Sequence, residues 1–290
     1  MARGLDHIVH AVRDLDAGAE LYRRLGFRVG VRNRHPWGTH NYVVQLPGFF
    51  IELLTVAEPE KLGSDGFSVL FGSFNRRFLE RSDGLSMLLL ESADAEADAR
   101  AFRENAIAAS DAMRFEREGR RPDGSAVKVA FSLAFARDTG APDIGFAVCQ
   151  QQYPENFWNP AFQSHANKVT GIASAIIVAE NPTDHHIFLS AFTGERELQS
   201  TSSGITIATP RGGIQVMDPA AYGNHFGVPP PDISTGAKLA AMRFVTADMA
   251  ATTASLARGK VAFSMRLGRF IVGPDHSMGA AIIFEEPTAL

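Results

Sequence analysis

The chain has a single cysteine, Cys149, among its 290 residues. One cysteine cannot form a disulfide within the chain, which is typical of proteins from reducing compartments. The sequence also lacks the ~18-residue apolar run that a membrane-spanning helix requires, and its first residues lack the apolar core of a signal peptide. We therefore expect a cytoplasmic protein without a membrane partner. Because Cys149 follows an apolar run, we expect a buried, inert thiol rather than a nucleophile.

Strongly basic and phosphate-binding segments are missing as well. The formal net charge is −4, and no block of lysine and arginine offers the positive surface that neutralises nucleic-acid phosphates. No glycine-rich loop is spaced to cradle a nucleotide phosphate, and the nucleophile elbow of serine hydrolases is absent. Nucleic acid is therefore excluded as a partner, a nucleotide cofactor has no support, and a small molecule is the expected ligand.

The first fifty residues contain the clearest secondary-structure pattern. Apolar runs at residues 5–12, 27–32, 42–46 and 49–56 predict strands. Between the first two runs a helix is predicted, with Asp14 as an N-cap candidate and Gly26 as its C-terminal stop. Pro47 and Gly48 form a turn before the last strand. The order of elements is therefore β-α-β-β-β.

The same order recurs three more times along the chain, with little repetition of residue identity. The four units are residues 5–57, 84–150, 170–218 and 238–286. Because a single unit leaves one face of its sheet exposed, we expect units to pair. The predicted fold class is α+β, with paired units forming two domains at residues 1–155 and 165–290. Residues 222–236 include three consecutive prolines and are predicted to be a linker without helix.

Several segments resemble the vicinal oxygen chelate superfamily, which includes glyoxalase I, extradiol dioxygenases and bleomycin-resistance proteins. They are Leu-Asp-His-Ile-Val-His-Ala-Val in the first strand, Tyr-Arg-Arg-Leu-Gly-Phe at the helix end and Phe-Ile-Glu-Leu-Leu in the last strand of the first unit. Residues 35–41 are similar to a Gly-Thr-x-Asn segment of the glyoxalase-like subgroup, and residues 149–160 resemble a linker of paired-domain members. The resemblance implies glyoxalase-like domains in which paired units form half-open curved sheets around a cavity.

The resemblance also implies a metal site. In catalytic members, His and Glu side chains from the first and last strands of two units hold a divalent metal that binds two neighbouring substrate oxygens. His7 and Glu52 match the first-strand His and last-strand Glu of glyoxalase I, so they are the predicted catalytic residues and the predicted ligands of zinc, nickel, manganese or iron. Glu52 could instead accept a substrate hydrogen bond or act as a general base with a raised pKa.

Strand alternation separates His7 from the second histidine of the same strand. His7 and Val9 share one face, whereas Ile8 and His10 share the other. If His7 faces the cavity, then His10 lies beneath the helix. For His10 we therefore expect a buried neutral imidazole that is hydrogen-bonded to the backbone.

The other units do not supply the remaining donors. The residues that align with the first-strand His are Leu85, Ser86 or Met87 in the second unit, Ala173 or Ser174 in the third, and Ala240 or Ala241 in the fourth. None of these is a good ligand for a hard dication. The closing strand of the second unit, residues 144–149, has no carboxylate. These departures argue against both lactoylglutathione lyase and extradiol dioxygenase activity.

A polar segment precedes the closing strands of the first unit. It gathers arginine, histidine and tryptophan side chains, a mixture that is typical of a pocket rim holding an anionic or amide-bearing ligand, since Arg can bind a carboxylate bidentately. We predict that Arg34, His40 and Asn41 bind substrate, together with Gln151 from the linker. A solvated loop is the alternative interpretation.

Two functions remain open. One is a metal-assisted lyase or isomerase that acts on a small oxygenated metabolite, and it is favoured by the Arg, His and Glu side chains of the first unit. The other is a metal-free small-molecule binding or resistance-type protein, favoured by the missing ligands elsewhere. Sheets could pair within one chain or between the chains of a homodimer, and the sequence does not decide between these arrangements.

Overall fold

The computed structural model describes residues 1–120 and 125–287. Its first half contains β1 (Leu5–Ala11), α1 (Leu15–Arg24), β2 (Asn33–Arg34), β3 (Thr39–Leu46), β4 (Phe49–Val56), α2 (Phe74–Arg81), β5 (Gly84–Glu91), α3 (Ala95–Glu104), β6 (Met113–Arg120), β7 (Ala126–Ala136), β8 (Gly145–Gln151) and α4 (Pro154–Phe157). A π-helical turn at Ser68–Ser73 leads into α2. Short 3₁₀ turns lie at Pro59–Lys61 and Pro160–Phe162.

The second half contains β9 (Val169–Val178), α5 (His186–Thr193), β10 (Gln199–Thr201), β11 (Gly204–Ala208), β12 (Gly213–Met217), α6 (Pro219–Phe226), β13 (Lys238–Thr246), α7 (Met249–Arg258), β14 (Ser264–Arg266), β15 (Arg269–Val272) and β16 (Ala281–Glu285). Short 3₁₀ turns lie at Pro182–His185 and Pro274–His276. Within the described residues, no helix is both long enough and apolar enough to cross a membrane.

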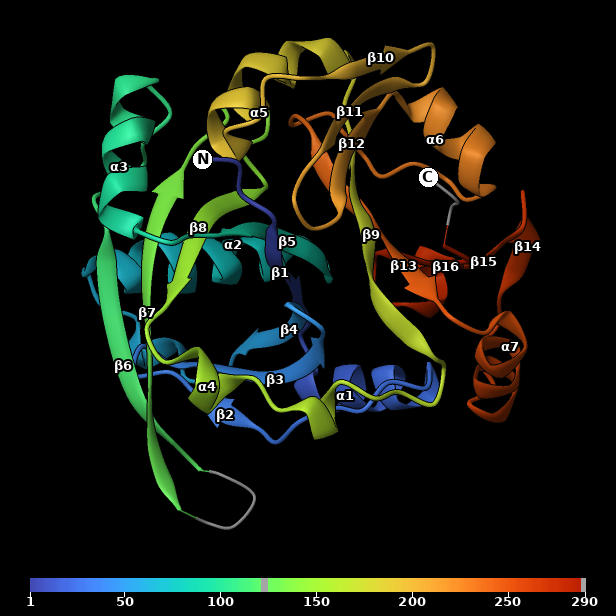
Figure 1. The fold of residues 1–290 in the computed structure, drawn as a ribbon, viewed down its shortest axis with the longest axis horizontal. Coiled ribbons are helices and arrows are strands. Elements are labelled where there is room, and N and C mark those ends of the chain that lie inside the picture. The colour runs from blue at the N-terminus through green and yellow to red at the C-terminus, as the bar shows by residue number, and fades with distance from the viewer. Residues whose placement is uncertain (121–124, 288–290) are drawn as a thin grey trace.

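The strands form two curved eight-stranded sheets (Figure 1). Their orders are β2-β3-β4-β1-β5-β8-β7-β6 and β10-β11-β12-β9-β13-β16-β15-β14. In each sheet the first strands of two successive units pair antiparallel at the centre, β1 with β5 and β9 with β13. The predicted α+β class and the four βαβββ units are therefore confirmed, and each sheet is completed within one chain.

Most predicted helix starts are explained by side-chain caps. The carboxylates of Asp14, Asp94 and Asp248 accept hydrogen bonds from backbone N–H groups in the first turns of α1, α3 and α7, which satisfies donors that the helix itself leaves unpaired. The predicted strand at residues 27–32 was wrong, because only the two residues of β2 pair with β3. The prediction of a linker without helix at 222–236 was also wrong, because the first residues of this segment, 222–226, belong to a helix. Asp218 caps α6, which has proline at its first turn and runs to Phe226.

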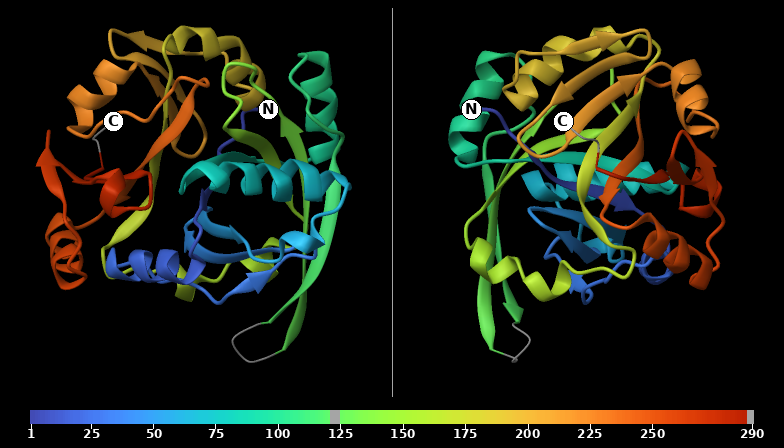
Figure 2. Two further views of the ribbon diagram at one scale, coloured as in Figure 1. Left: turned by 180° about the vertical axis from the view of Figure 1, so that it is seen from behind. Right: turned by 45° about the vertical axis from the view of Figure 1, so that its right-hand side comes forward.

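Three apolar cores organise the molecule. The largest lies between the sheets and includes Ile8 of β1 and Phe244 of β13, together with side chains of α1, α3, α5 and α7. The face of each sheet that points away from this shared core is called its inner face. A second core lines the inner face of the first sheet, and a third, which includes Tyr222 and Phe226 of α6, lines the inner face of the second sheet. Figure 2 shows the two sheets and their helices from behind and in an oblique view. The shared core holds the sheets together, and the two inner faces carry different side chains.

His10 lies in this interface, as its strand position predicted. Its Nδ1 lies 2.9 Å from the Tyr22 hydroxyl oxygen and its Nε2 2.9 Å from the backbone oxygen of Met278. Complete burial lowers the pKa of His10 below its ordinary value, so the imidazole is neutral. The prediction of a buried, backbone-bonded histidine beneath the helix is therefore confirmed.

Gly26 carries the first stability prediction. It has φ +90°, and a Cβ there would lie 2.7 Å from Ser255 Cβ and 2.9 Å from Asn167 Cβ. Because Gly26→Ala combines left-handed strain with overpacking between the halves, we expect a loss of about 2–4 kcal/mol of unfolding free energy in urea. Gly268→Ala is the matched control. Gly268 has φ +74°, but among the described residues no atom beyond its chain neighbours lies within 4 Å of an added Cβ, so strain alone should cost about 1–2 kcal/mol. Equal losses would contradict the packing role of Gly26.

Candidate functional site

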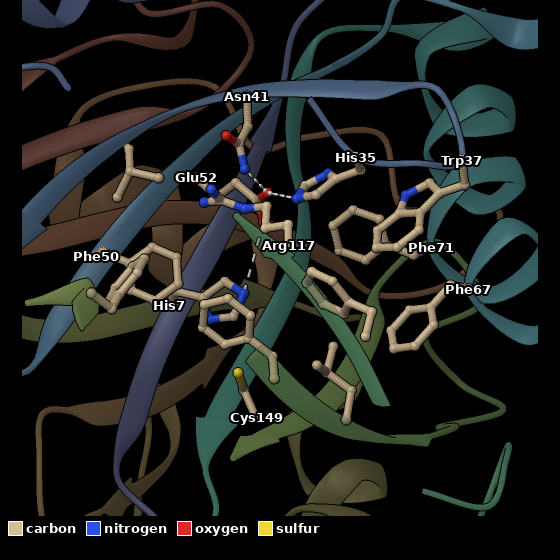
Figure 3. Close-up of a pocket in the computed structure, with 15 residues that line it drawn as sticks. His7, His35, Trp37, Asn41, Phe50, Glu52, Phe67, Phe71, Arg117 and Cys149 are labelled. Carbon is tan, nitrogen blue, oxygen red and sulfur yellow. Dashed lines mark hydrogen bonds and ion pairs between the residues drawn. The ribbon is translucent and has the colours of Figure 1, made fainter. Parts of the chain in front are cut away.

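A cavity opens on the inner face of the first sheet (Figure 3). Its volume is about 50 Å³, small enough that a ligand of more than a few atoms requires aromatic side chains to shift. Polar groups gather at one end and aromatic rings cover most of the remaining wall. The lining residues are His7, His35, Trp37, Asn41, Val43, Phe50, Glu52, Phe67, Phe71, Phe115, Arg117, Phe131, Leu133, Cys149 and Phe157.

Glu52 is the central polar residue of the cavity. It lies on β4 with only 5% of its surface exposed. Asn41 Nδ2 on the adjacent strand β3 donates to Glu52 Oε1 at 2.5 Å, and His7 Nε2 lies 3.8 Å from Oε2. Burial raises the pKa of Glu52 above its ordinary value, although the charges of His7 and Arg117 and the Asn41 hydrogen bond oppose this shift. Glu52 is thus a more basic carboxylate than an exposed one, at a position that a ligand can reach.

His7 is oriented by its neighbours. Its Nδ1 lies 2.6 Å from Asp6 Oδ2, and its ring stacks on Phe50 with centroids 4.2 Å apart. Gln151 Nε2 donates to the other oxygen of Asp6 at 3.0 Å. Because a carboxylate only accepts, the proton of a neutral His7 lies on Nδ1, which leaves Nε2 as an acceptor facing Glu52.

Asp6 reaches this position because of a β-bulge. Leu5 pairs with Leu90 and His7 with Leu89, so Asp6 is an extra residue on β1. A bulge redirects a side chain that strict alternation would place on the opposite face. Strand alternation applied to the sequence therefore does not predict the contact between Asp6 and His7.

Two buried hydrogen-bond donors in the cavity wall have no partner among the described residues. They are Nε1 of Trp37 and Nε of Arg117, a residue of β6. Buried donors without partners are rare and call for an explanation such as a ligand. Desolvation lowers the pKa of Arg117, while the charge of Glu52 opposes that effect. The cavity therefore offers donors for an oxygen-bearing ligand beside a carboxylate base.

A stack of planar side chains forms one wall of the cavity. His35 lies parallel to Trp37, with centroids 4.7 Å apart and planes 13° apart, and Trp37 lies parallel to Phe67 at 5.0 Å and 8°. His35 Nδ1 lies 2.8 Å from Thr39 Oγ1. Burial, with contributions from the charges of Arg117 and His40, lowers the pKa of His35 to about 3. His35 is therefore neutral at physiological pH and contributes a flat surface that suits a planar ligand.

The predicted site residues lie in different surroundings. His7, Glu52 and Asn41 line the cavity, and Gln151 contacts it indirectly through Asp6. His40 faces away, with Nε2 2.7 Å from Glu58 Oε1. Arg34 is exposed on β2. Sequence reasoning missed Asp6 and also Arg117, whose strand was not predicted although Met113–Arg120 alternates apolar and charged residues in its first half.

The strand registers test whether the first sheet can hold the metal implied by the resemblance. In all four units, the residue five positions before the helix N-cap pairs with the last strand: Val9 with Glu52, Leu89 with Ala147, Ile176 with Gln215 and Arg243 with Ile283. The positions equivalent to His7 and Glu52 in the paired unit are therefore Met87 and Ala147. Neither is a ligand for a hard dication, and the Arg117 charge acts on Glu52. These donors do not fit a four-ligand His and Glu site.

A different group of potential ligands lies on the other side of the His7 ring. Asp6, His7 and Cys149 each offer one ligand atom, and these atoms lie within 4.8 Å of one another. All three residues are buried. Burial, with contributions from the charges of Asp6 and Glu52 and a hydrogen bond to Asp6, raises the pKa of the Cys149 thiol well above its ordinary value. Without a metal the thiol is protonated, as expected for an inert cysteine.

The raised pKa of Glu52 leads to a prediction about stability. A carboxyl group with a higher pKa in the folded state binds more protons when folded, so its contribution falls as pH rises through that pKa. Glu52→Gln removes the buried charge, so we expect a higher melting temperature than wild type at pH 8. The difference should shrink as pH is lowered toward 5. A difference that grows on acidification would contradict the raised pKa.

Comparisons with known proteins agree with this fold. A family model described as a glyoxalase-like domain matches residues 5–193. A hypothetical protein from Staphylococcus aureus has a similar structure, with a TM-score of 0.66, 13% sequence identity, and coverage of 98% of this chain and 100% of that chain. A mutant of 4-hydroxymandelate synthase from Streptomyces coelicolor gives a TM-score of 0.59, 12% identity, and coverage of 99% and 94%.

These two structural likenesses concern the fold alone, because the identities are low. A search of curated proteins found no match. The family match, in contrast, spans more than half of the chain, including the whole first sheet and the cavity. The chain therefore belongs to the glyoxalase-like domain family, within the vicinal oxygen chelate superfamily.

Proposed function

We propose that the cavity of the first sheet is the active site of a lyase or isomerase that moves a proton on its substrate. The substrate is a small molecule with a planar or apolar body and an anionic or carbonyl oxygen. The observation that carries this proposal is Glu52: a buried carboxylate with a raised pKa at the polar end of an aromatic cavity. A carboxylate whose pKa is raised above its ordinary value is a stronger base than an exposed one and is suited to general-base catalysis.

The surrounding residues supply the other parts of a proton-transfer step. Glu52 takes a proton from a carbon next to the substrate carbonyl, and the C–H electron pair moves onto the carbonyl oxygen. Arg117 and the Trp37 N–H stabilise the resulting oxyanion, because both supply buried donors. His7 Nε2, which lies 3.8 Å from Glu52 Oε2, accepts the proton from Glu52 once the two side chains approach to hydrogen-bond distance, and Asp6 stabilises the imidazolium through Nδ1. Return of the proton to a different atom gives isomerisation, and loss of a leaving group from the enolate gives elimination.

The rival function is binding without reaction. The aromatic wall and the two unpartnered donors would equally suit a protein that sequesters a flat, oxygen-bearing compound. The two functions differ in what they require of Glu52. A binding protein gains nothing from a base with a raised pKa, whose burial costs stability, so the environment of Glu52 favours the enzyme.

Hydrogen exchange tests the proposal whatever the final product of the reaction is. The protein is incubated in D₂O with a panel of small aromatic and branched-chain oxo acids and hydroxy ketones, and deuterium is followed at the carbon next to the carbonyl by NMR. We expect wild-type protein to catalyse exchange for a compound that also quenches Trp37 fluorescence. Tight binding across the panel without any exchange would instead support the sequestering protein.

A further inference from the structure

Asp6, His7 and Cys149 form a second candidate centre next to the proposed catalytic groups. His7 Nε2 faces Glu52 (Figure 3), whereas Nδ1 lies 2.6 Å from Asp6 Oδ2, so one ring separates the two groups. The Cys149 thiol forms a hydrogen bond with Asp6, the residue that His7 Nδ1 contacts. A nucleophile activated by Nε2 is therefore not what this arrangement provides.

We infer that Asp6, His7 Nδ1 and Cys149 bind a thiophilic divalent metal of the zinc class. Mixed sulfur, nitrogen and oxygen donors are the ligands that zinc takes in proteins, and three protein ligands leave a fourth position open. The three ligand atoms already converge within 4.8 Å. Around a tetrahedral ion, ligand atoms lie about 3.3–3.7 Å apart, so the 2.6 Å Asp6–His7 contact would have to open by roughly 1 Å.

The metal replaces protons rather than filling an empty space. In its absence a proton joins Asp6 to His7 Nδ1, and another remains on the Cys149 sulfur. When the ion binds, the thiol proton leaves to solvent and the imidazole proton moves from Nδ1 to Nε2. Gln151 continues to hold the second Asp6 oxygen at 3.0 Å, which is the outer-shell role that orients a ligating carboxylate.

This site differs from the one that the fold resemblance implies. That site would use His7 Nε2 and Glu52, whose counterparts in the paired unit are Met87 and Ala147. The inferred site uses the opposite ring nitrogen and a cysteine. A thiolate ligand gives a spectroscopic signal that a His and Glu site cannot give, so the two sites can be told apart. Because the bound metal would put the imidazole proton on Nε2, His7 can accept a proton from Glu52 only in the metal-free protein, and the two proposals are tested on different forms of the protein.

Cobalt(II) titration of metal-free, untagged full-length protein tests the inference. We expect intense near-ultraviolet thiolate-to-cobalt charge-transfer absorption in the wild type and in Glu52→Gln, and none in Cys149→Ala. Gln151→Leu should retain the band but bind cobalt roughly 10–100-fold more weakly. Zinc should compete for the same site and raise the melting temperature of the wild type.

Two results would overturn the inference, and both are read on the wild type, so they stand even if Cys149→Ala does not fold. One is stoichiometric cobalt binding to the wild type without a thiolate band. This result would place the ion at His7 Nε2, and Glu52→Gln should then lose cobalt binding. The other is the absence of cobalt or zinc binding altogether.

Discussion

Glu52→Gln is expected to reduce proton-transfer turnover by roughly 10²–10⁴-fold, the range by which a positioned general base accelerates such steps. Glutamine keeps the shape of the side chain and can still accept the Asn41 hydrogen bond, so ligand affinity should change little. Turnover is measured by deuterium exchange, and affinity through Trp37 fluorescence in a Trp158→Phe background, since these are the two tryptophans of the chain.

The pH dependence adds a second expectation for the same residue. Because Glu52 acts as a base only when ionised, wild-type turnover should rise with pH through the raised pKa of this group. His35 should add no transition near neutrality, since its pKa is about 3. Glu60→Gln, which alters an exposed carboxylate outside the cavity, is the control and should behave as wild type. Undiminished turnover in Glu52→Gln would remove Glu52 from the mechanism.

Arg117→Met is expected to weaken binding of an anionic ligand by roughly 10- to 100-fold, because a hydrogen bond to a charged group contributes about 1.5–3 kcal/mol. It should also move the acidic limb of the pH profile upward, since the charge of Arg117 lowers the pKa of Glu52. Ligand titration and a pH series measure the two effects separately.

The same strand provides a matched control for this change. Arg114 also lies on β6, but it is exposed and pairs with Glu116 at 3.4 Å. Arg114→Met removes the same charge from the same hairpin without reaching the cavity. If Arg114→Met and Arg117→Met gave equal affinities and equal pH midpoints, Arg117 would have no specific role in the site.

The fold was predictable where local chemistry decides it. Asp14, Asp94 and Asp248 start helices by capping them, and apolar runs between them form the strands of both sheets. Prediction failed where long-range pairing decides the structure. Residues 27–32 touch β3 through Gly30, whose N–H donates to the Val43 oxygen at 2.9 Å, but they form no strand with it. α6 has a local start signal in Asp218 and Pro219, and its Tyr222 and Phe226 pack on the inner face of the second sheet.

The candidate site was predictable to a similar extent. His7, Glu52 and Asn41 lie in motifs that resemble the superfamily, and the structure brings them to one cavity. Asp6 could not be predicted, because a one-residue bulge sets its direction. Arg117 lies 65 residues beyond Glu52 in the sequence, on a strand with a largely charged sequence, and only the closure of the curved sheet brings the two together.

The role of Glu52 as a base is tested most sharply by measuring the protonation of its carboxyl group. Protein labelled with ¹³C at the glutamate side-chain carboxyl is titrated by NMR, and Glu52→Gln identifies the signal. We expect the signal that is absent from the Glu52→Gln spectrum to titrate clearly above the ordinary glutamate pKa of about 4.3. If that signal titrated at or below the ordinary value, Glu52 would be a simple partner of Arg117 and Asn41, and the proposed base would be lost.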